Sequence, residues 1–243
     1  MICKLCQQEK PLLRRSHIIP DFMYQGIFDE DHFLYRGNAS NLENVDMVPT
    51  GEYEGNILCR ECDNEVIGRY ENYSSCALYG GRLPADECPT FDNIHINDIQ
   101  AILCRNFEYH KFKLFLLSIL WRSSISNRDF FRNVDLGSNE ENIRAMIING
   151  DAGNDTNYPI LIVSFLGNQN IPPEIIGQPH RFRKDQLEGY TYLINGFFYI
   201  FFISSEDLPQ FYINASINHS NEMKIIQLQP EQAQRFLRRY MGY

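Results

Sequence analysis

Apolar residues recur at a helical spacing over residues 97–124. The positions that carry this spacing are Ile99, Ile102, Leu103, Phe107, Phe112, Phe115, Leu116, Ile119 and Leu120. A period near 3.6 predicts a long helix that is buried along a broad face. We expect this helix to anchor the larger part of the chain, and a second helix over residues 140–148.

Further along the chain, strand patterns dominate. The predicted strands are residues 159–166, 190–195, 197–204, 210–216 and 223–228. Asn195-Gly196 stands between two aromatic runs, which is a strong indication of a hairpin with a type I′ turn. Residues 230–240 begin with a proline and are expected to form a last helix.

The first part of the chain has short apolar runs and many turn residues. A short helix is predicted over residues 20–28, a loop with one hairpin over 30–56, and a helical pattern from Cys59 onward. Glycines and prolines between residues 76 and 93 indicate a boundary. We therefore predict a small module over residues 1–78 and a larger domain over 90–243.

Composition supports a packed protein. Of the 243 residues, 44% are hydrophobic and 13% are aromatic, which is enough to bury a core and argues against disorder. The start of the chain lacks a signal-peptide layout. The most apolar run, residues 112–121, is interrupted by Lys113 and Ser118 and is shorter than the about 20 residues of a membrane span. We expect a soluble, cytoplasmic protein.

Two Cys-x-x-Cys pairs lie in the small module, Cys3 with Cys6 and Cys59 with Cys62. Four thiolates are the soft ligands that tetrahedral zinc prefers. The long gap between the pairs favours a treble clef, in which a hairpin knuckle gives one pair and a helix N-terminus gives the other. The predicted fold class is α+β: a zinc-stapled module, then a domain with a long helix and an antiparallel sheet.

The remaining cysteines do not suggest disulfides. The chain has 7 cysteines, an odd number, and a reducing compartment keeps thiols free. Cys76, Cys88 and Cys104 lack paired spacing, and we interpret them as buried small hydrophobic residues.

Other residues keep a fixed order around the cysteines. The segment Arg14-Arg15-Ser16-His17-Ile18-Ile19-Pro20 lies between the pairs, and Asp63-Asn64 comes directly after the second pair. This order resembles the zinc-bearing HNH endonucleases, also called ββα-metal nucleases. The matched motifs cover about residues 1–73. The later stretch around Trp121-Arg122 looks similar to the region after this module in bacterial proteins labelled HNH endonuclease-like, and it implies no chemistry.

The resemblance implies hydrolysis of DNA phosphodiester bonds. His17 matches the family's general base, which takes a proton from the attacking water, and a neutral imidazole at cellular pH suits that task. A Mg²⁺ or Mn²⁺ ion beside it would neutralise charge on the scissile phosphate. Zinc would be structural. The alternative for His17 is a ring that packs between strand and helix or replaces a cysteine at zinc.

One departure from the family pattern concerns the cation. Family members usually carry Asp or Glu immediately before the catalytic histidine, and here that residue is Ser16, a poorer ligand for magnesium. Asp63 stands where the family often has His or Asn, so the cation site could be shifted. Asp63 is equally well explained as a helix cap.

Asn64 and Glu71 complete the candidate site. They lie seven residues apart, so on an α-helix their side chains share one face about two turns apart. Glu71 could bind the cation or orient His17, although a solvated helix glutamate is the simpler interpretation. Lys10, Arg14, Arg15, Arg60 and Arg69 could neutralise phosphates without reading bases.

Net charge weighs against unaided DNA binding. The value of −9 gives no long-range steering toward phosphate. Basic residues do gather locally, at Arg14-Arg15, at residues 181–184 and at Arg235, Arg238 and Arg239. We expect DNA as the partner, and a larger domain that restrains the nuclease in response to a protein or ligand, as in a bacterial defence or restriction effector.

Other functions stay open. A zinc-stapled module without catalysis would bind nucleic acid and take no second metal, and a protein-interaction module would bind no DNA. The resemblance allows a homodimer, in which two copies cut both strands, but no heptad seam marks a dimer interface.

Overall fold

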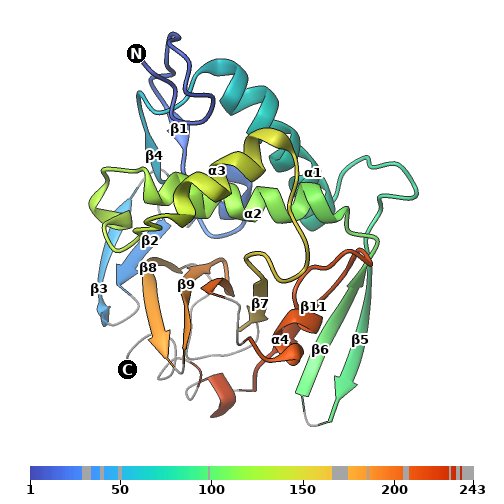
Figure 1. Ribbon diagram of the computed structural model, residues 1–243. Coiled ribbons are helices and arrows are strands. Elements are labelled where there is room, and N and C mark those ends of the chain that lie inside the picture. Colours follow the sequence, from blue (N-terminus) through green and yellow to red (C-terminus); the bar gives the residue numbers. More distant parts are fainter. Residues whose placement is uncertain are drawn as a thin grey trace.

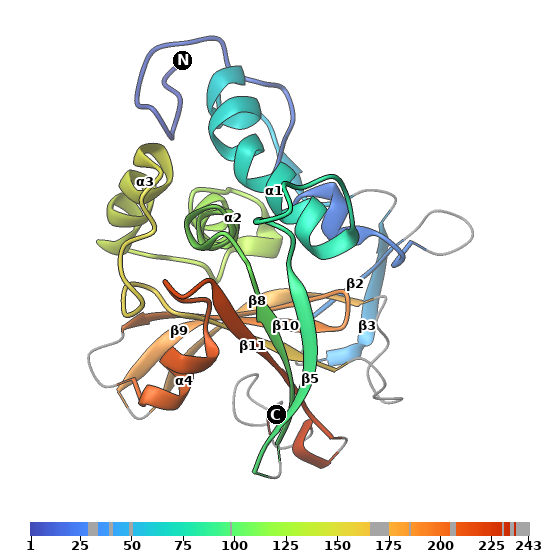
Figure 2. The same cartoon turned by 90° about the vertical axis from the view of Figure 1, so that its right-hand side faces the viewer.

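The computed structural model describes residues 1–28, 34–38, 41–48, 51–97, 99–165, 175–184, 186–204, 208–229, 231–233 and 236. Helices and a large sheet form the chain, so the predicted α+β class is confirmed. Helices cover one face of the sheet, and the N-terminal cysteine segment lies on the far side of these helices (Figures 1 and 2).

The helical elements include a short π-helix and two 3₁₀ helices. They are η1 (Asp21–Tyr24), η2 (Glu61–Ile67), α1 (Gly68–Tyr79), α2 (Tyr109–Ser124), η3 (Asp129–Phe131), α3 (Asn139–Asn149) and α4 (Gln210–Ala215). The strands are β1 (Ser16–His17), β2 (Leu34–Asn38), β3 (Asn41–Val48), β4 (Tyr53–Glu54), β5 (Thr90–Ile96), β6 (Ile99–Arg105), β7 (Ile160–Ser164), β8 (Ile175–Lys184), β9 (Leu187–Ile194), β10 (Phe197–Ser204) and β11 (Glu222–Gln227).

In the described part of the chain, nine strands form the large sheet, in the order β3-β2-β8-β9-β10-β7-β11-β6-β5. Its pairs are antiparallel except for β2 with β8 and β11 with β7. The predicted hairpin within residues 30–56 is confirmed as β2 and β3. Through β2, the sheet combines strands from both predicted segments of the chain, 1–78 and 90–243. Strands β1 and β4 form a separate small sheet.

Helix α2 is the centre of the core. Every residue from Phe112 to Ser123 is buried, because α1 and α3 pack along its sides and the sheet lies beneath it (Figure 2). A helix that is apolar almost all round needs such cover. One hydrophobic cluster joins the cysteine segment, α1 to α3 and one sheet face, and a second lies on the other face with α4.

Two predicted elements differ from the structure. Residues 97–108 are not the start of the long helix, because β6 occupies Ile99–Arg105 and pairs with β5 and β11. Asn97 and Asn106 have positive φ angles of 54° and 61°, so they end the strand at each side. Short apolar runs fit both periods, and here the two neighbouring strands decide. The helix starts only at Tyr109.

The predicted strand at 210–216 is the second difference, since Gln210–Ala215 forms α4. Pro209 stands just before it and favours the first helical turn. Strands β5 and β8 were not predicted. Asn195 and Gly196 have φ angles of 52° and 73°, which confirms the hairpin with a type I′ turn between β9 and β10.

The other predicted helices and strands are largely confirmed. Residues 20–28 contain η1, residues 140–148 lie in α3, and the remaining strands correspond to β7, β9, β10 and β11. Most of the last predicted helix, residues 230–240, lies outside the described residues. Among the described residues, no helix combines the length and apolarity needed to cross a bilayer.

Candidate functional site

The predicted cysteines come together. One ligand atom each from Cys3, Cys6, Cys59 and Cys62 lies within 4.8 Å of the other three, so the cluster could hold a metal ion such as zinc. Four soft sulfur ligands fit tetrahedral zinc well.

Two short backbone motifs position these thiols. The first pair lies on a tight turn, in which Gln7 donates its N–H to the Cys3 carbonyl over 2.9 Å and has a φ of 57°. The second pair spans the entry into η2, where Cys59 pairs with Leu12 across an isolated bridge. The tight turn thus supplies Cys3 and Cys6, and the start of η2 supplies Cys59 and Cys62.

Burial and backbone hydrogen bonds shift the pKa of these thiols in opposite directions. Burial raises the pKa of Cys59 to about 11. Burial also acts to raise the pKa of Cys3, but backbone hydrogen bonds at Cys6, Cys59 and Leu5 outweigh it and lower the pKa to about 7. The N–H of Cys59 donates to the Cys3 sulfur over 3.3 Å. Metal binding would favour the thiolate form of all four groups.

His17 lies on the small sheet that β1 and β4 form. Ser16 pairs with Glu54 and His17 pairs with Tyr53, and the helical segment η2 and α1 comes after β4. The two strands approach closely at Gly55, where a Cβ atom would lie 2.5 Å from the Arg14 carbonyl oxygen. Along the chain, η1, β2 and β3 lie between β1 and β4, and η2 and α1 follow β4.

The His17 side chain is accessible and has an acidic partner. It is 35% exposed, and its Nε2 lies 3.1 Å from Asp21 Oδ1 in the next turn. Ser16, in contrast, is completely buried. Its hydroxyl lies beside the Asp63 carboxylate but makes no well-aligned hydrogen bond with any described residue.

The π-helix decides which side chains face this site. The Gly68 N–H donates to the Asp63 carbonyl, five residues earlier, so this turn holds one residue more than an α-turn. The negative charge of Glu71 consequently acts on the Asp63 carboxyl group, whereas the Asn64 side chain is exposed. The predicted shared face of Asn64 and Glu71 assumed a regular α-helix, and the extra residue replaces it with a shared face of Asp63 and Glu71.

Asp63 is held in a partly buried setting. Burial raises the pKa of its carboxyl group, and the positive charge of Arg122 and the negative charge of Glu71 act on it in opposite directions. The structure therefore brings together Ser16, His17, Asp63 and Glu71 from β1, η2 and α1.

Arg122 is the site residue that sequence reasoning missed. It belongs to α2 and is only 1% exposed. Its Nη1 donates to the His17 carbonyl oxygen over 2.6 Å, and its Nη2 lies 2.8 Å from Glu71 Oε1. A charged residue directly after a long apolar run was the feature that could have revealed it, because such a position demands buried partners.

The basic clusters have different surroundings. Arg14 and Arg15 are exposed near His17, whereas Arg181 and Arg183 form ion pairs with Glu188 at 2.5 and 3.7 Å. The side chains of Arg235, Arg238 and Arg239 lie outside the described residues. Of the three other cysteines, Cys104 is buried and Cys76 is half-buried. Cys88 is exposed because it lies in the loop before β5, so its predicted burial was wrong.

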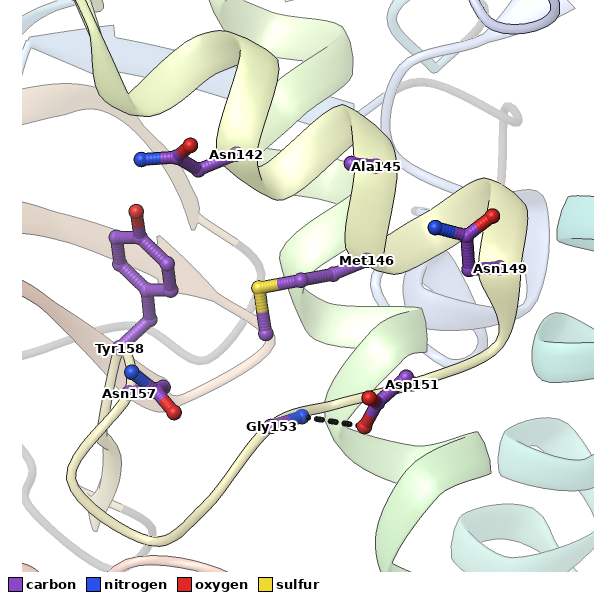
Figure 3. A pocket seen from close by; sticks show the side chains of 8 residues that line it. All are labelled: Asn142, Ala145, Met146, Asn149, Asp151, Gly153, Asn157 and Tyr158. Atoms are coloured by element: carbon purple, nitrogen blue, oxygen red, sulfur yellow. Dashed lines mark hydrogen bonds between the residues drawn. The ribbon is translucent and has the colours of Figure 1, made fainter.

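A surface pocket of about 390 Å³ lies elsewhere, between α3 and the loop that precedes β7 (Figure 3). Amide and hydroxyl groups dominate its polar lining, and Met146 supplies apolar surface. Its lining residues are Asn142, Ala145, Met146, Asn149, Asp151, Gly153, Asn157 and Tyr158. It contains none of the predicted site residues.

Comparisons with models of known protein families, with curated proteins and with solved structures find no match to this chain. The site must therefore be interpreted from its own geometry.

Proposed function

We propose that the chain is a metal-dependent HNH-type endonuclease that hydrolyses DNA phosphodiester bonds. The observation that carries this proposal is the accessible His17 ring on the β1–β4 sheet, beside Asp63, which directly follows Cys62 of the four-cysteine cluster. An accessible imidazole next to a carboxylate is suited to general base catalysis.

Asp21 gives the imidazole an orientation. When the Nε2–H of neutral His17 donates to Asp21 over 3.1 Å, the Nδ1 atom is the one that can accept a proton from water. The hydrogen bond from Arg122 to the His17 carbonyl fixes the backbone from the opposite side. Precise placement of a base relative to its water is worth large factors in rate.

The donor set beside His17 fits one hard cation. The Asp63 carboxylate and the Ser16 hydroxyl offer oxygen ligands, and Mg²⁺ and Mn²⁺ commonly bind through one or two carboxylates together with substrate phosphates. Such an ion would neutralise charge on the scissile phosphate. Zinc at the cysteines would be structural.

Local positive charge supports DNA as the substrate despite the net charge of −9. The guanidinium of Arg15 lies 3.8 Å from the centre of the Tyr53 ring, and that of Arg128 lies 5.6 Å from it. Tyr53 is the strand partner of His17. Two guanidinium groups therefore lie against the strand partner of His17, where they can contact phosphates without reading sequence.

Plasmid nicking with Mg²⁺ or Mn²⁺ tests the proposal. We expect His17→Ala to keep its zinc and to nick DNA at least about 100-fold more slowly, the usual contribution of a general base. His95→Ala is the matched control, because His95 is an exposed residue of β5. Equal nicking by both variants would contradict the assignment of His17.

A second candidate is a zinc-stapled binding module without catalysis. The ion pair between Arg122 and Glu71 favours it, because this pairing leaves the Glu71 carboxylate less available to a cation. This candidate predicts zinc, no second cation and a DNA mobility shift at low salt without cleavage. A protein-interaction module would give no shift, and a nuclease restrained by its larger domain would cleave only with a partner or ligand.

A further inference from the structure

The buried guanidinium of Arg122 connects three separate elements. It donates to the His17 carbonyl on β1, forms an ion pair with Glu71 on α1, and donates to the carbonyl and hydroxyl of Ser118 on its own helix, both at 3.2 Å. A buried charge is tolerated only with such partners. The guanidinium stays charged at any cellular pH.

The carboxylates of Asp63 and Glu71 interact electrostatically with the guanidinium of Arg122. The positive charge of Arg122 and the negative charge of Glu71 both act on the Asp63 carboxyl group. Two buried polar atoms, the Ser16 hydroxyl and Glu71 Oε1, lack a well-aligned hydrogen bond to any described residue. The Glu71 oxygen has only its ion pair at 2.8 Å, and the Ser16 oxygen lies beside Asp63.

We propose that Arg122 is a built-in counter-ion that engages Glu71, so that Asp63 is the carboxylate left to bind a divalent cation. Arg122 is then a positioning residue and Glu71 is not a cation ligand. The inference deepens the proposed endonuclease function, since it concerns the cation site of that function. The reason is charge: a guanidinium paired with one carboxylate repels a divalent cation from that carboxylate.

Mn²⁺ binding provides a measurement that is independent of cleavage. The zinc-loaded full chain is titrated with Mn²⁺, and the paramagnetic resonance signal of free Mn²⁺ reports binding. Arg122→Gln removes the counter-ion and frees Glu71, so two carboxylates face the cation. We expect at least about tenfold tighter Mn²⁺ binding than in the wild type. Unchanged or weaker binding by the folded variant overturns the proposal.

A second variant covers the case in which Arg122→Gln does not fold. The double variant Glu71→Gln with Arg122→Gln removes both members of the ion pair, so neither is left as an unpaired charge, which makes folding easier. Because Asp63 remains, we expect Mn²⁺ affinity within about threefold of the wild type. A loss of about tenfold or more would make Glu71 a cation ligand and overturn the proposal.

One further variant and the cleavage assay of the wild type separate this inference from the function on which it rests. Asp63→Asn should remove the tight Mn²⁺ binding of Arg122→Gln, and persistence of that binding overturns the assignment of Asp63. Failure of the wild type to nick DNA would count against the endonuclease. Tighter Mn²⁺ binding by Arg122→Gln would even then support the role of Arg122.

Discussion

Helix α2 carries a buried cation near each of its ends, and the two are stabilised differently. Lys113 and Arg122 are 0% and 1% exposed. Arg122 lies in the last turn, where the helix dipole favours positive charge, and has a carboxylate at 2.8 Å. Lys113 lies near the N-terminal end and donates to the Tyr109 hydroxyl and the Asn154 carbonyl at 2.9 and 3.0 Å.

The groups that contact each side chain decide whether Lys113 and Arg122 stay charged. Burial lowers the pKa of Lys113 to about 7, and the more distant Asp151 and Asp155 oppose this only in part. Arginine cannot give up its proton in this way, so its site must supply an anion. The comparison indicates that one end of α2 responds to pH, while the other holds a permanent charge beside His17.

The largest expected effect concerns the cysteine cluster. Cys59→Ser should lose the metal and about 5 kcal/mol of stability, a fall in Tm of roughly 10–20 °C for a chain of this size. Zinc content and thermal unfolding measure this. Cys88→Ser is the control, because that thiol is exposed. Wild-type zinc content and Tm in Cys59→Ser would show that the cluster is not a metal site.

Loss of the Arg122 charge should come next. Arg122→Met leaves Glu71 without its ion pair and the His17 carbonyl without its donor, which should cost about 3–5 kcal/mol. Urea unfolding measures the difference. Adding Glu71→Gln to this variant should recover part of the loss, since position 71 then carries no unpaired charge. A cost below about 1 kcal/mol in the single variant would refute a tightly coupled pair.

Substitution of Lys113 should change the free energy of unfolding by an amount that depends on pH. The folded pKa lies below the unfolded value, so the unfolded chain binds more protons between the two values and wild-type stability rises with pH from about 7 upward. Lys113→Met lacks this slope. Its stability relative to the wild type should therefore be greater at pH 6 than at pH 9, by roughly 1–3 kcal/mol.

Urea unfolding of both proteins at several pH values between 6 and 9 checks this expectation. The difference between the two cancels contributions from groups that they share, the thiols included. A difference that does not change with pH would mean that Lys113 stays charged when folded.

The smallest effect should come from Asp155, whose negative charge acts to raise the pKa of Lys113. Asp155→Asn should lower that pKa further and also weaken the contact with His219 at 2.7 Å, at a cost below about 1 kcal/mol. Nitrogen NMR of the lysine ammonium follows the titration. Asp86→Asn is the control, because Asp86 lies in an exposed loop, and it should leave the titration of Lys113 unchanged. An unchanged pKa of Lys113 in Asp155→Asn would show that Asp155 does not act on this lysine.

Much of the local structure could be predicted from sequence. The Cys-x-x-Cys spacing predicted which four thiols meet, and Asn195-Gly196 predicted a hairpin, because turn chemistry and metal ligation act within a few residues. The segment 97–108 could not be assigned correctly. Its apolar pattern fits both periods, and strands β5 and β11 on either side decide for a strand.

The polar clusters were less accessible to sequence reasoning. His110 and His219 showed no partnered spacing, yet their ring centres lie 6.1 Å apart beside Tyr109. Loop 151–158 brings Asp151 and Asp155 to the same place. Such contacts join residues that are remote in the chain, so no local pattern records them.

The sequence by itself determined the α+β class, the cysteine cluster and the position of His17 before a Pro-containing turn, because these depend on hydrophobic period and short motifs. Only the tertiary structure decided that Asp63 rather than Asn64 faces Glu71, and that Arg122 joins them. A π-turn shifts the helix face by one residue, and a buried guanidinium takes its partners from β1 and α1. Both are consequences of packing, which satisfies buried charge with whichever residues the fold brings near.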